Sequence, residues 1–156
     1  MHARTSPSST FAVPGALAGL AGAILIDFYL LATLVAIGHV TTVAGFYRYV
    51  ASGALGKTAE AAPNAVAIGF ALHVAVAVAW GIGYAYVAAR TPQVRERPAI
   101  SGAVFGLLVM IAMQLVEVYA NIYVLPNSAL FFNGIVAHVV FYGWPVAFIV
   151  RRQLPA

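Results

Sequence analysis

Residues 15–38 read GALAGLAGAILIDFYLLATLVAIG, and Asp27 is the one charged residue among them. A bilayer hydrocarbon core about 30 Å thick is crossed by about 20 helical residues, so this run is long enough to span it. Three further apolar runs of similar length follow, at about 64–89, 99–124 and 129–150. Together the four runs use most of the 156 residues, and they predict a protein with four transmembrane helices.

The composition agrees with lipid as the solvent for most of the chain. Hydrophobic residues make up 63% of it and charged residues 8%, against about 25% charged in ordinary soluble domains. The runs are rich in Ala, Gly and Leu and lack the strict alternation of a barrel strand. We therefore expect an all-α membrane fold, a four-helix bundle of up-down-up-down topology. Residues 14–152 would form its single transmembrane domain, after a flexible cytoplasmic tail at 1–13.

Prolines and basic residues delimit and orient the predicted spans. Pro14, Pro63 and Pro98 stand at the starts of the first three spans, where a missing N–H costs nothing. Short loops on the cytoplasmic side of a membrane carry an excess of Lys and Arg. One predicted side carries Arg4, Arg90, Arg95, Arg97, Arg151 and Arg152, and the other carries Arg48 and Lys57. Both termini are therefore expected in the cytoplasm. The net charge of +4 forms no patch typical of nucleic-acid binding, so no nucleic-acid partner is expected.

The first loop on the opposite side is long and amphipathic. It carries Phe46, Tyr47 and Tyr49 around Arg48. Such a mixture suits a short helix at the lipid–water interface, and a plain mobile loop is an equal alternative. Tryptophan Trp80 is expected to anchor its span near the headgroups.

The two halves of the sequence share short glycine motifs. Each half opens with G-x-x-x-G, at Gly15/Gly19 and at Gly102/Gly106, and a polar residue follows in each half at Asp27 and Gln114. The second and fourth spans both contain G-x-x-x-H, as GFALH at 69–73 and GIVAH at 134–138. These matches predict an internal repeat of two parallel hairpins, although 14 glycines make chance matches common. The four G-x-x-x-G glycines are expected to mediate close helix packing.

Five polar side chains are expected at one depth near the middle of the bilayer. They are Asp27, His73, Gln114, Glu117 and His138. On the third span Gln114, Glu117 and Asn121 follow at i, i+3 and i+7, which places them on one helical face. We interpret these six residues as a polar cluster or ligand-binding site inside the bundle.

The ionisable members of this cluster are costly in lipid. A carboxylate at mid-membrane costs about 2.5–3.5 kcal/mol, so it should be paired, protonated or facing a wet cavity. Asp27 has His73 and His138 at matching depth to meet. The alternative is that these side chains only hold helices together, at about 0.6 kcal/mol for each hydrogen bond.

The stretches GFALHVAVAVAWGIGYAY and HVVFYGWPVAF, with the glycine-rich first span carrying Asp27 and the glycine-led third span, resemble a set of bacterial inner-membrane families with four spans. The similarity covers about residues 14–150 and is greatest to the domain-of-unknown-function relatives of the YagU type. Their second and fourth spans carry a histidine that falls here on His73 and His138. The resemblance implies the inner (plasma) membrane, and a role in acid tolerance is associated with one branch. A proline common in the third span of some relatives is missing between Met110 and Gln114.

Three functional hypotheses follow, and the sequence specifies no cofactor. The first is proton or small-solute handling by the polar layer, in a homodimer or small homo-oligomer packed through the glycine faces. The second is a haem or metal site, with His73 and His138 as facing ligands and Asp27 and Glu117 as further candidates. The third is a structural or accessory subunit. Enzyme chemistry is the least supported, because the chain has no Cys and no phosphate-binding glycine loop before a Lys.

Overall fold

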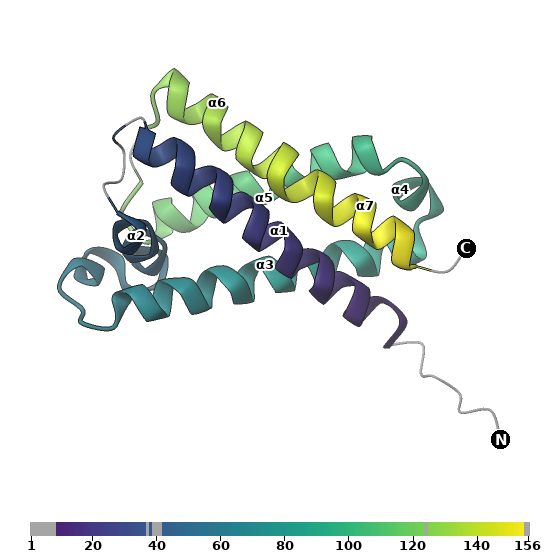
Figure 1. Cartoon of the computed structure of the whole chain (residues 1–156), viewed down its shortest axis with the longest axis horizontal. Helices are drawn as coiled ribbons and strands as arrows, with labels where there is room; N and C mark the ends of the chain where they lie inside the picture. Colours follow the sequence, from purple (N-terminus) through teal and green to yellow (C-terminus); the bar gives the residue numbers. More distant parts are fainter. Residues whose placement is uncertain (1–8, 37, 39–41, 124, 155–156) are drawn as a thin grey trace.

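The computed structural model describes residues 9–36, 38, 42–123 and 125–154. Four of its helices are long and apolar enough to cross a membrane, namely Phe11–Ala36, Ala65–Arg90, Pro98–Tyr119 and Ser128–Gln153. The described residues form helices and connecting turns without a strand. The protein is therefore an all-α bundle of four transmembrane helices, as the sequence predicts (Figure 1).

The elements follow one another along the chain as α1 (Ser9–Ala36), α2 (Val43–Leu55), η1 (Gly56–Glu60), α3 (Ala65–Arg90), α4 (Pro92–Glu96), α5 (Pro98–Tyr119), α6 (Ser128–Val136), η2 (Ala137–Gly143) and α7 (Trp144–Gln153). The spans are α1, α3, α5 and the continuous helix formed by α6, η2 and α7. In Figure 1 the start of α1 and the end of α7 lie at one end of the bundle, and α2 lies at the other.

The first span begins earlier than the apolar pattern suggests. Helix α1 starts at Ser9 and contains Pro14 inside it, whereas we expected Pro14 to mark the helix start. Residues 9–13 are thus helical and not part of a tail. The remainder of the predicted tail, residues 1–8, lies outside the described residues.

Glycines let α1 and α3 approach until their backbones touch. A Cβ atom on Gly19 would lie 2.8 Å from Cα of Val78, and one on Gly15 would lie 2.6 Å from Cα of Ile82. The partner helix contributes Gly81, whose Cβ would lie 2.7 Å from Cα of Gly19. No side chain fits between the helices here, so the expected packing role of Gly15 and Gly19 is met within the chain.

The second hairpin uses its glycines in the same way. A Cβ on Gly102 would lie 2.8 Å from the carbonyl oxygen of Gly143, and one on Gly106 would lie 2.9 Å from Cα of Val139. In both hairpins the glycines of one helix are therefore covered by the other helix of the same chain. A second copy would have to dock through another surface. The two predicted hairpins thus share the same kind of glycine packing. The spacing from histidine to glycine differs between them, because His138 lies nearer to Gly143 along the chain than His73 lies to Gly81.

The four spans pack in the order α3, α1, the fourth span and α5. Helix α1 contacts α3 on one side and η2 and α7 on the other, while α5 packs on η2 and α7. Helices α3 and α5 meet through large side chains, since the hydroxyl of Tyr84 lies 2.8 Å from Oγ of Ser101 and the ring of Tyr84 packs on that of Phe105 at a centroid distance of 4.9 Å. These contacts close the ring of four spans, and side chains from every span meet inside it.

The fourth span widens into a π-helix over η2. The N–H of Trp144 bonds to the carbonyl of Val139, five residues back. Pro145 stands two residues after the end of η2. A proline lacks an N–H and its ring collides with the carbonyl four residues before it, so a wider turn at this point relieves the clash.

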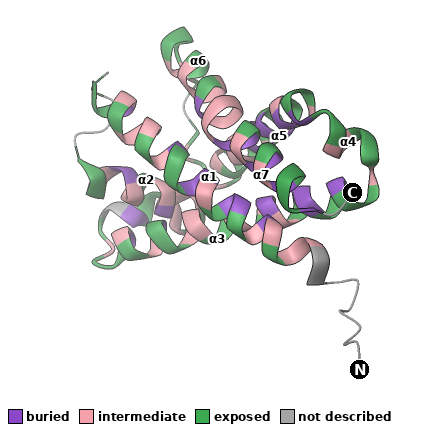
Figure 2. Cartoon of the chain, turned by 45° about the vertical axis from the view of Figure 1, so that its right-hand side comes forward, coloured by how far each residue is buried: buried purple, intermediate pink, exposed green. Residues whose placement is uncertain are grey.

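Apolar residues cover both the inside and the outside of the bundle. Figure 2 shows buried positions where the spans cross and exposed ones on their outer faces. Large hydrophobic side chains such as Phe28, Ile100 and Leu115 are more than half exposed. No polar or charged residue among those described falls in the fully buried class. Such a surface suits lipid, because in water it would be one extended apolar patch.

Candidate intramembrane binding site

Asp27 of α1 and His73 of α3 are paired across the interface that the glycines bring close. Nε2 of His73 lies 2.8 Å from Oδ1 of Asp27, and the two side chains are 17% and 14% exposed. Both atoms are buried, and neither has a regular hydrogen bond to any described residue. Each is therefore the other's polar partner, at an ion-pair distance that lacks ideal hydrogen-bond alignment.

Helix α2 supplies the second contact of Asp27. The hydroxyl of Tyr47 donates to Oδ2 of Asp27 at 2.8 Å. The helix can reach this point because it lies directly on α3, where a side chain on Gly69 would collide with the backbone of Tyr47. Phe46 is buried beside it, with its ring edge toward His73 at a centroid distance of 6.1 Å. Of the two alternatives for this segment, the amphipathic helix is therefore the one that forms.

The same helix binds the other membrane carboxylate. The hydroxyl of Tyr49 donates to Oε1 of Glu117 on α5 at 2.5 Å. Tyr47 and Tyr49 thus connect α2 to Asp27 of the first span and to Glu117 of the third. Two tyrosines two residues apart on a helix point in different directions, which is why one short helix can serve both acids.

Both tyrosines keep their protons. Burial, followed by the hydrogen bond to Asp27, raises the pKa of Tyr47 to about 12. Burial, followed by the hydrogen bond to Glu117, also raises the pKa of Tyr49. A raised pKa means that the folded state binds the proton more tightly. The resulting stabilisation is fully present below pH 10.0, the ordinary pKa of tyrosine, and is lost as the pH rises through the folded value.

Removing these hydroxyls tests whether they hold α2 in place. In the double variant Tyr47→Phe/Tyr49→Phe, amide hydrogen exchange in α2 should accelerate, because each hydrogen bond to a carboxyl oxygen contributes about 0.5–1.5 kcal/mol. Exchange in α3 should not change. The matched control is Tyr119→Phe, since that side chain is 93% exposed. Equal α2 exchange in the double variant and the control would show that the tyrosines do not hold the helix.

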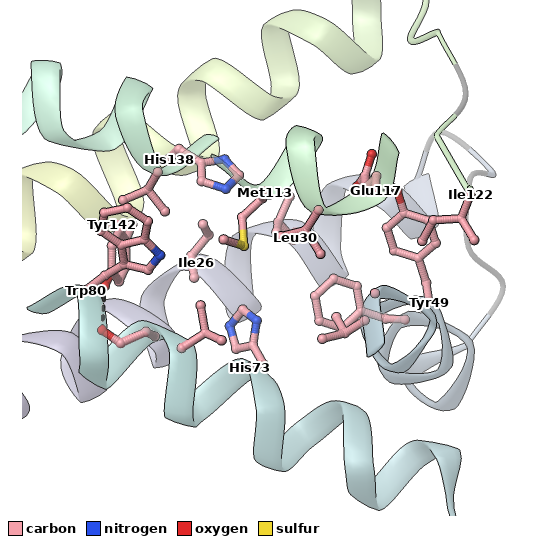
Figure 3. Close-up of a pocket in the computed structure, with 17 residues that line it drawn as sticks. Ile26, Leu30, Tyr49, His73, Trp80, Met113, Glu117, Ile122, His138 and Tyr142 are labelled. Atoms are coloured by element: carbon pink, nitrogen blue, oxygen red, sulfur yellow. Dashed lines mark hydrogen bonds between the residues drawn. The ribbon is translucent and has the colours of Figure 1, made fainter. Parts of the chain in front are cut away.

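A cavity of about 190 Å³ lies beside the pair, and residues of all four spans and of α2 line it (Figure 3). His73 and His138 extend into it from opposite sides, with Ile26 and Met113 between them in this view. Asp27 is absent from the lining and reaches the cavity through His73.

A second cavity of about 240 Å³ shares part of the same wall. His138, Glu117, Met113 and Tyr49 line both cavities. Gln114 lines only the second one. The predicted polar residues are therefore divided, with His73, Glu117 and His138 on the first cavity, Gln114 on the second, and Asp27 on neither.

His138 is satisfied differently from His73. Its Nδ1 lies 2.9 Å from the carbonyl oxygen of Gly134, one turn earlier in the same helix. Asp27 therefore meets one of the two expected histidines. In the described part of the chain, no three His, Asp or Glu side chains come close enough together to hold a metal ion. A haem is also larger than this cavity, which is smaller than the 300–1,000 Å³ of typical sites for drug-sized ligands. The metal and haem hypotheses gain no support from this geometry.

The stripe of polar residues on the third span ends before Asn121, contrary to our expectation. Helix α5 stops at Tyr119, and Asn121 has a φ of 57° in the turn that follows. The N–H of Asn121 bonds to the carbonyl of Val118, and the N–H of Ile122 bonds to that of Glu117. This is a Schellman motif with asparagine at the left-handed position. Asn121 therefore ends the helix and does not continue its inner face.

Three residues of the site escaped prediction. Tyr47 and Tyr49 were expected only at the membrane interface, and Trp80 only as a headgroup anchor, whereas Trp80 lines the cavity. The spacing of the two tyrosines on an amphipathic segment is a signal, because two membrane carboxylates each needed a donor. Nothing in the sequence distinguishes Trp80 from an anchor.

No known protein family, curated protein or solved structure matches the chain. Its function is therefore inferred from the cavity and from the polar side chains around it.

Proposed function

We propose that this membrane protein binds a small solute within the bilayer and exchanges a proton through Asp27 and His73. The observation that carries the proposal is the 2.8 Å contact between these side chains beside a cavity lined by all four spans. Ionisable residues inside membrane helices commonly mark solute paths and proton relays. An imidazole bonded to a carboxylate can accept a proton without leaving an isolated charge in lipid.

The remaining contacts of the pair support this role. Tyr47 holds Oδ2 of Asp27, so the carboxylate presents Oδ1 to the imidazole. The ring of His73 then stands between the acid and the cavity. A proton arriving from a bound solute would meet His73 first, with Asp27 stabilising the imidazolium that forms.

The proposal includes a location and an assembly. The excess of arginine near the chain ends and the α4 connection supports a cytoplasmic position for both termini, in the inner (plasma) membrane. A relationship with the YagU type of families would agree with proton handling, because acid tolerance is associated with one branch. Four helices are few for alternating access, so transport would require a homodimer that docks outside the glycine faces.

Neutralising Asp27 tests the proposal. Proteoliposomes that contain the full chain and a trapped pH-sensitive dye are given an external acid pulse, with the membrane potential clamped. The wild type should acidify faster than protein-free liposomes, and Asp27→Asn should fall to the protein-free rate because asparagine cannot take up the proton. Glu96→Gln in the exposed α4 connection is the matched control and should keep the wild-type rate. An Asp27→Asn rate equal to that of the wild type would refute the proposed function.

A further inference from the structure

Two polar groups on the cavity wall have no hydrogen-bond partner in the described part of the chain. The first is Nε2 of His138. A carbonyl oxygen can only accept, so the contact with Gly134 assigns the proton to Nδ1 and makes Nε2 an acceptor. The second is the indole N–H of Trp80, which is only a donor. Both side chains line the cavity, and both are drawn in Figure 3. Neither nitrogen is among the fully buried atoms without a partner, so both are open to bond with a molecule in the cavity, one as acceptor and one as donor.

The size of the cavity limits that partner. A protein cavity of about 150 Å³ lined by apolar side chains binds benzene. The cavity here is about 190 Å³, which accommodates one six-membered ring with small substituents. A larger molecule would have to place its remainder outside the cavity. The exposed side chains of Val76 on α3 and Val116 on α5 line the cavity, so it reaches the lipid-facing surface between these helices.

The walls of the cavity favour an aromatic ring over a charged solute. Phe46, Trp80 and Tyr142 line it, together with aliphatic side chains. Aromatic side chains add about 0.5–1.5 kcal/mol to ring packing beyond the area buried. The carboxyl groups near it already have partners, since Asp27 contacts His73 and accepts from Tyr47, and Glu117 accepts from Tyr49. A cation would therefore compete with existing partners, and an anion would meet no Lys or Arg in the lining.

We propose that the cavity binds a hydroxylated aromatic ring, such as a phenol or the ring of a quinol, through His138 and Trp80. A hydroxyl group matches both groups, because its hydrogen can be donated to Nε2 of His138 while its oxygen accepts from the indole N–H of Trp80. A second hydroxyl would face the free ring nitrogen of His73 on the opposite wall. The inference concerns binding alone, and it rests on the proposed function for the premise that the cavity holds a solute.

The test compares three rings: one with a hydroxyl donor, one whose oxygen can only accept, and one without a polar group. The full chain in lipid nanodiscs is titrated by calorimetry with phenol, with anisole as its methyl ether, and with toluene. Phenol should bind about fivefold more tightly than anisole, which corresponds to one net hydrogen bond. His138→Leu should remove the preference for phenol over anisole and leave toluene binding unchanged, and retained toluene binding reports that the cavity is still folded. Trp80→Phe should weaken binding of phenol and anisole alike relative to toluene, because the oxygen of both rings accepts from the indole N–H, whereas Trp144→Phe should change none of the three, because Trp144 bonds to the carbonyl of Ala99 outside the cavity.

Each result decides for or against the hydroxylated ring. Equal binding of phenol and anisole to the wild type overturns it, as does a preference that survives in His138→Leu. Filling the cavity with Val109→Phe should abolish binding of all three rings. If this variant gives the same calorimetric heat as the wild type, the heat comes from partition of the rings into lipid and the proposal is wrong. Failure of ring binding with normal proton exchange would leave the proposed function standing. Ring binding by a wild type that exchanges no protons would instead refute only the proposed function.

Discussion

Removing the imidazole in His73→Ala is expected to destabilise the folded protein by about 3–5 kcal/mol at neutral pH, because it leaves the charge of Asp27 uncompensated inside the membrane. Loss of the ring also empties part of the cavity wall, which adds to the cost. The free energy of unfolding can be measured by steric trapping in bicelles.

A double variant separates the charge effect from the loss of packing. Asp27→Leu/His73→Leu replaces the whole pair by apolar side chains, and buried pairs replaced in this way often lose little stability or gain some. We therefore expect the double variant to be more stable than His73→Ala while exchanging no protons. If His73→Ala loses no stability at neutral pH, the 2.8 Å contact does not compensate a buried charge.

The second large effect is expected at the closest helix contact. Gly19→Val should destabilise the protein by about 3 kcal/mol, the upper end of typical overpacking costs. The new side chain would meet the backbone of α3 at Ala77 and Val78, and backbone cannot move aside as a flexible side chain can. The helices would have to separate, so the contact between Asp27 and His73 should lengthen as well. Thermal unfolding of the protein in detergent measures the first effect.

Gly83→Ala is the matched control for this substitution. Gly83 lies in α3, and a Cβ there would have no atom within 4 Å among the described residues. Alanine at this position should therefore stabilise the helix by about 0.5–1 kcal/mol, as expected for glycine replaced in a helix interior. A Gly19→Val protein as stable as wild type would contradict the tight packing of α1 on α3.

The sequence predicts the spans and one essential pair for the same physical reason. Lipid cannot satisfy a polar group, so long apolar runs reveal the helices, and Asp27 inside such a run must find a partner. His73 was a candidate because its depth in the membrane matched. Depth alone is insufficient, however, since His138 met the same criterion and bonds through Nδ1 to the carbonyl of Gly134 in its own helix.

The inward face of each span and the role of α2 could not be predicted, because spans that are apolar on every side do not show which face turns inward. We expected the second and fourth spans to present their histidines to each other as diagonal neighbours, and His73 and His138 do extend into the cavity from opposite sides. The π-helix before Pro145 and the helix end at Asn121 each have a local signal, a proline and an asparagine. These signals predict a local change in the helix, but they do not predict which distant residues it brings into contact.

The opening of the cavity beside Val76 and Val116 has a consequence for any measured affinity. A cavity whose rim includes the lipid-facing Val76 and Val116 is filled from the hydrocarbon phase. Occupancy of the cavity then follows the concentration of a compound among the acyl chains. For an oil-soluble compound this concentration is far higher than that in the buffer. Two compounds with identical contacts in the cavity would give different apparent dissociation constants if one is more oil-soluble, and titrations must be compared per mole of lipid.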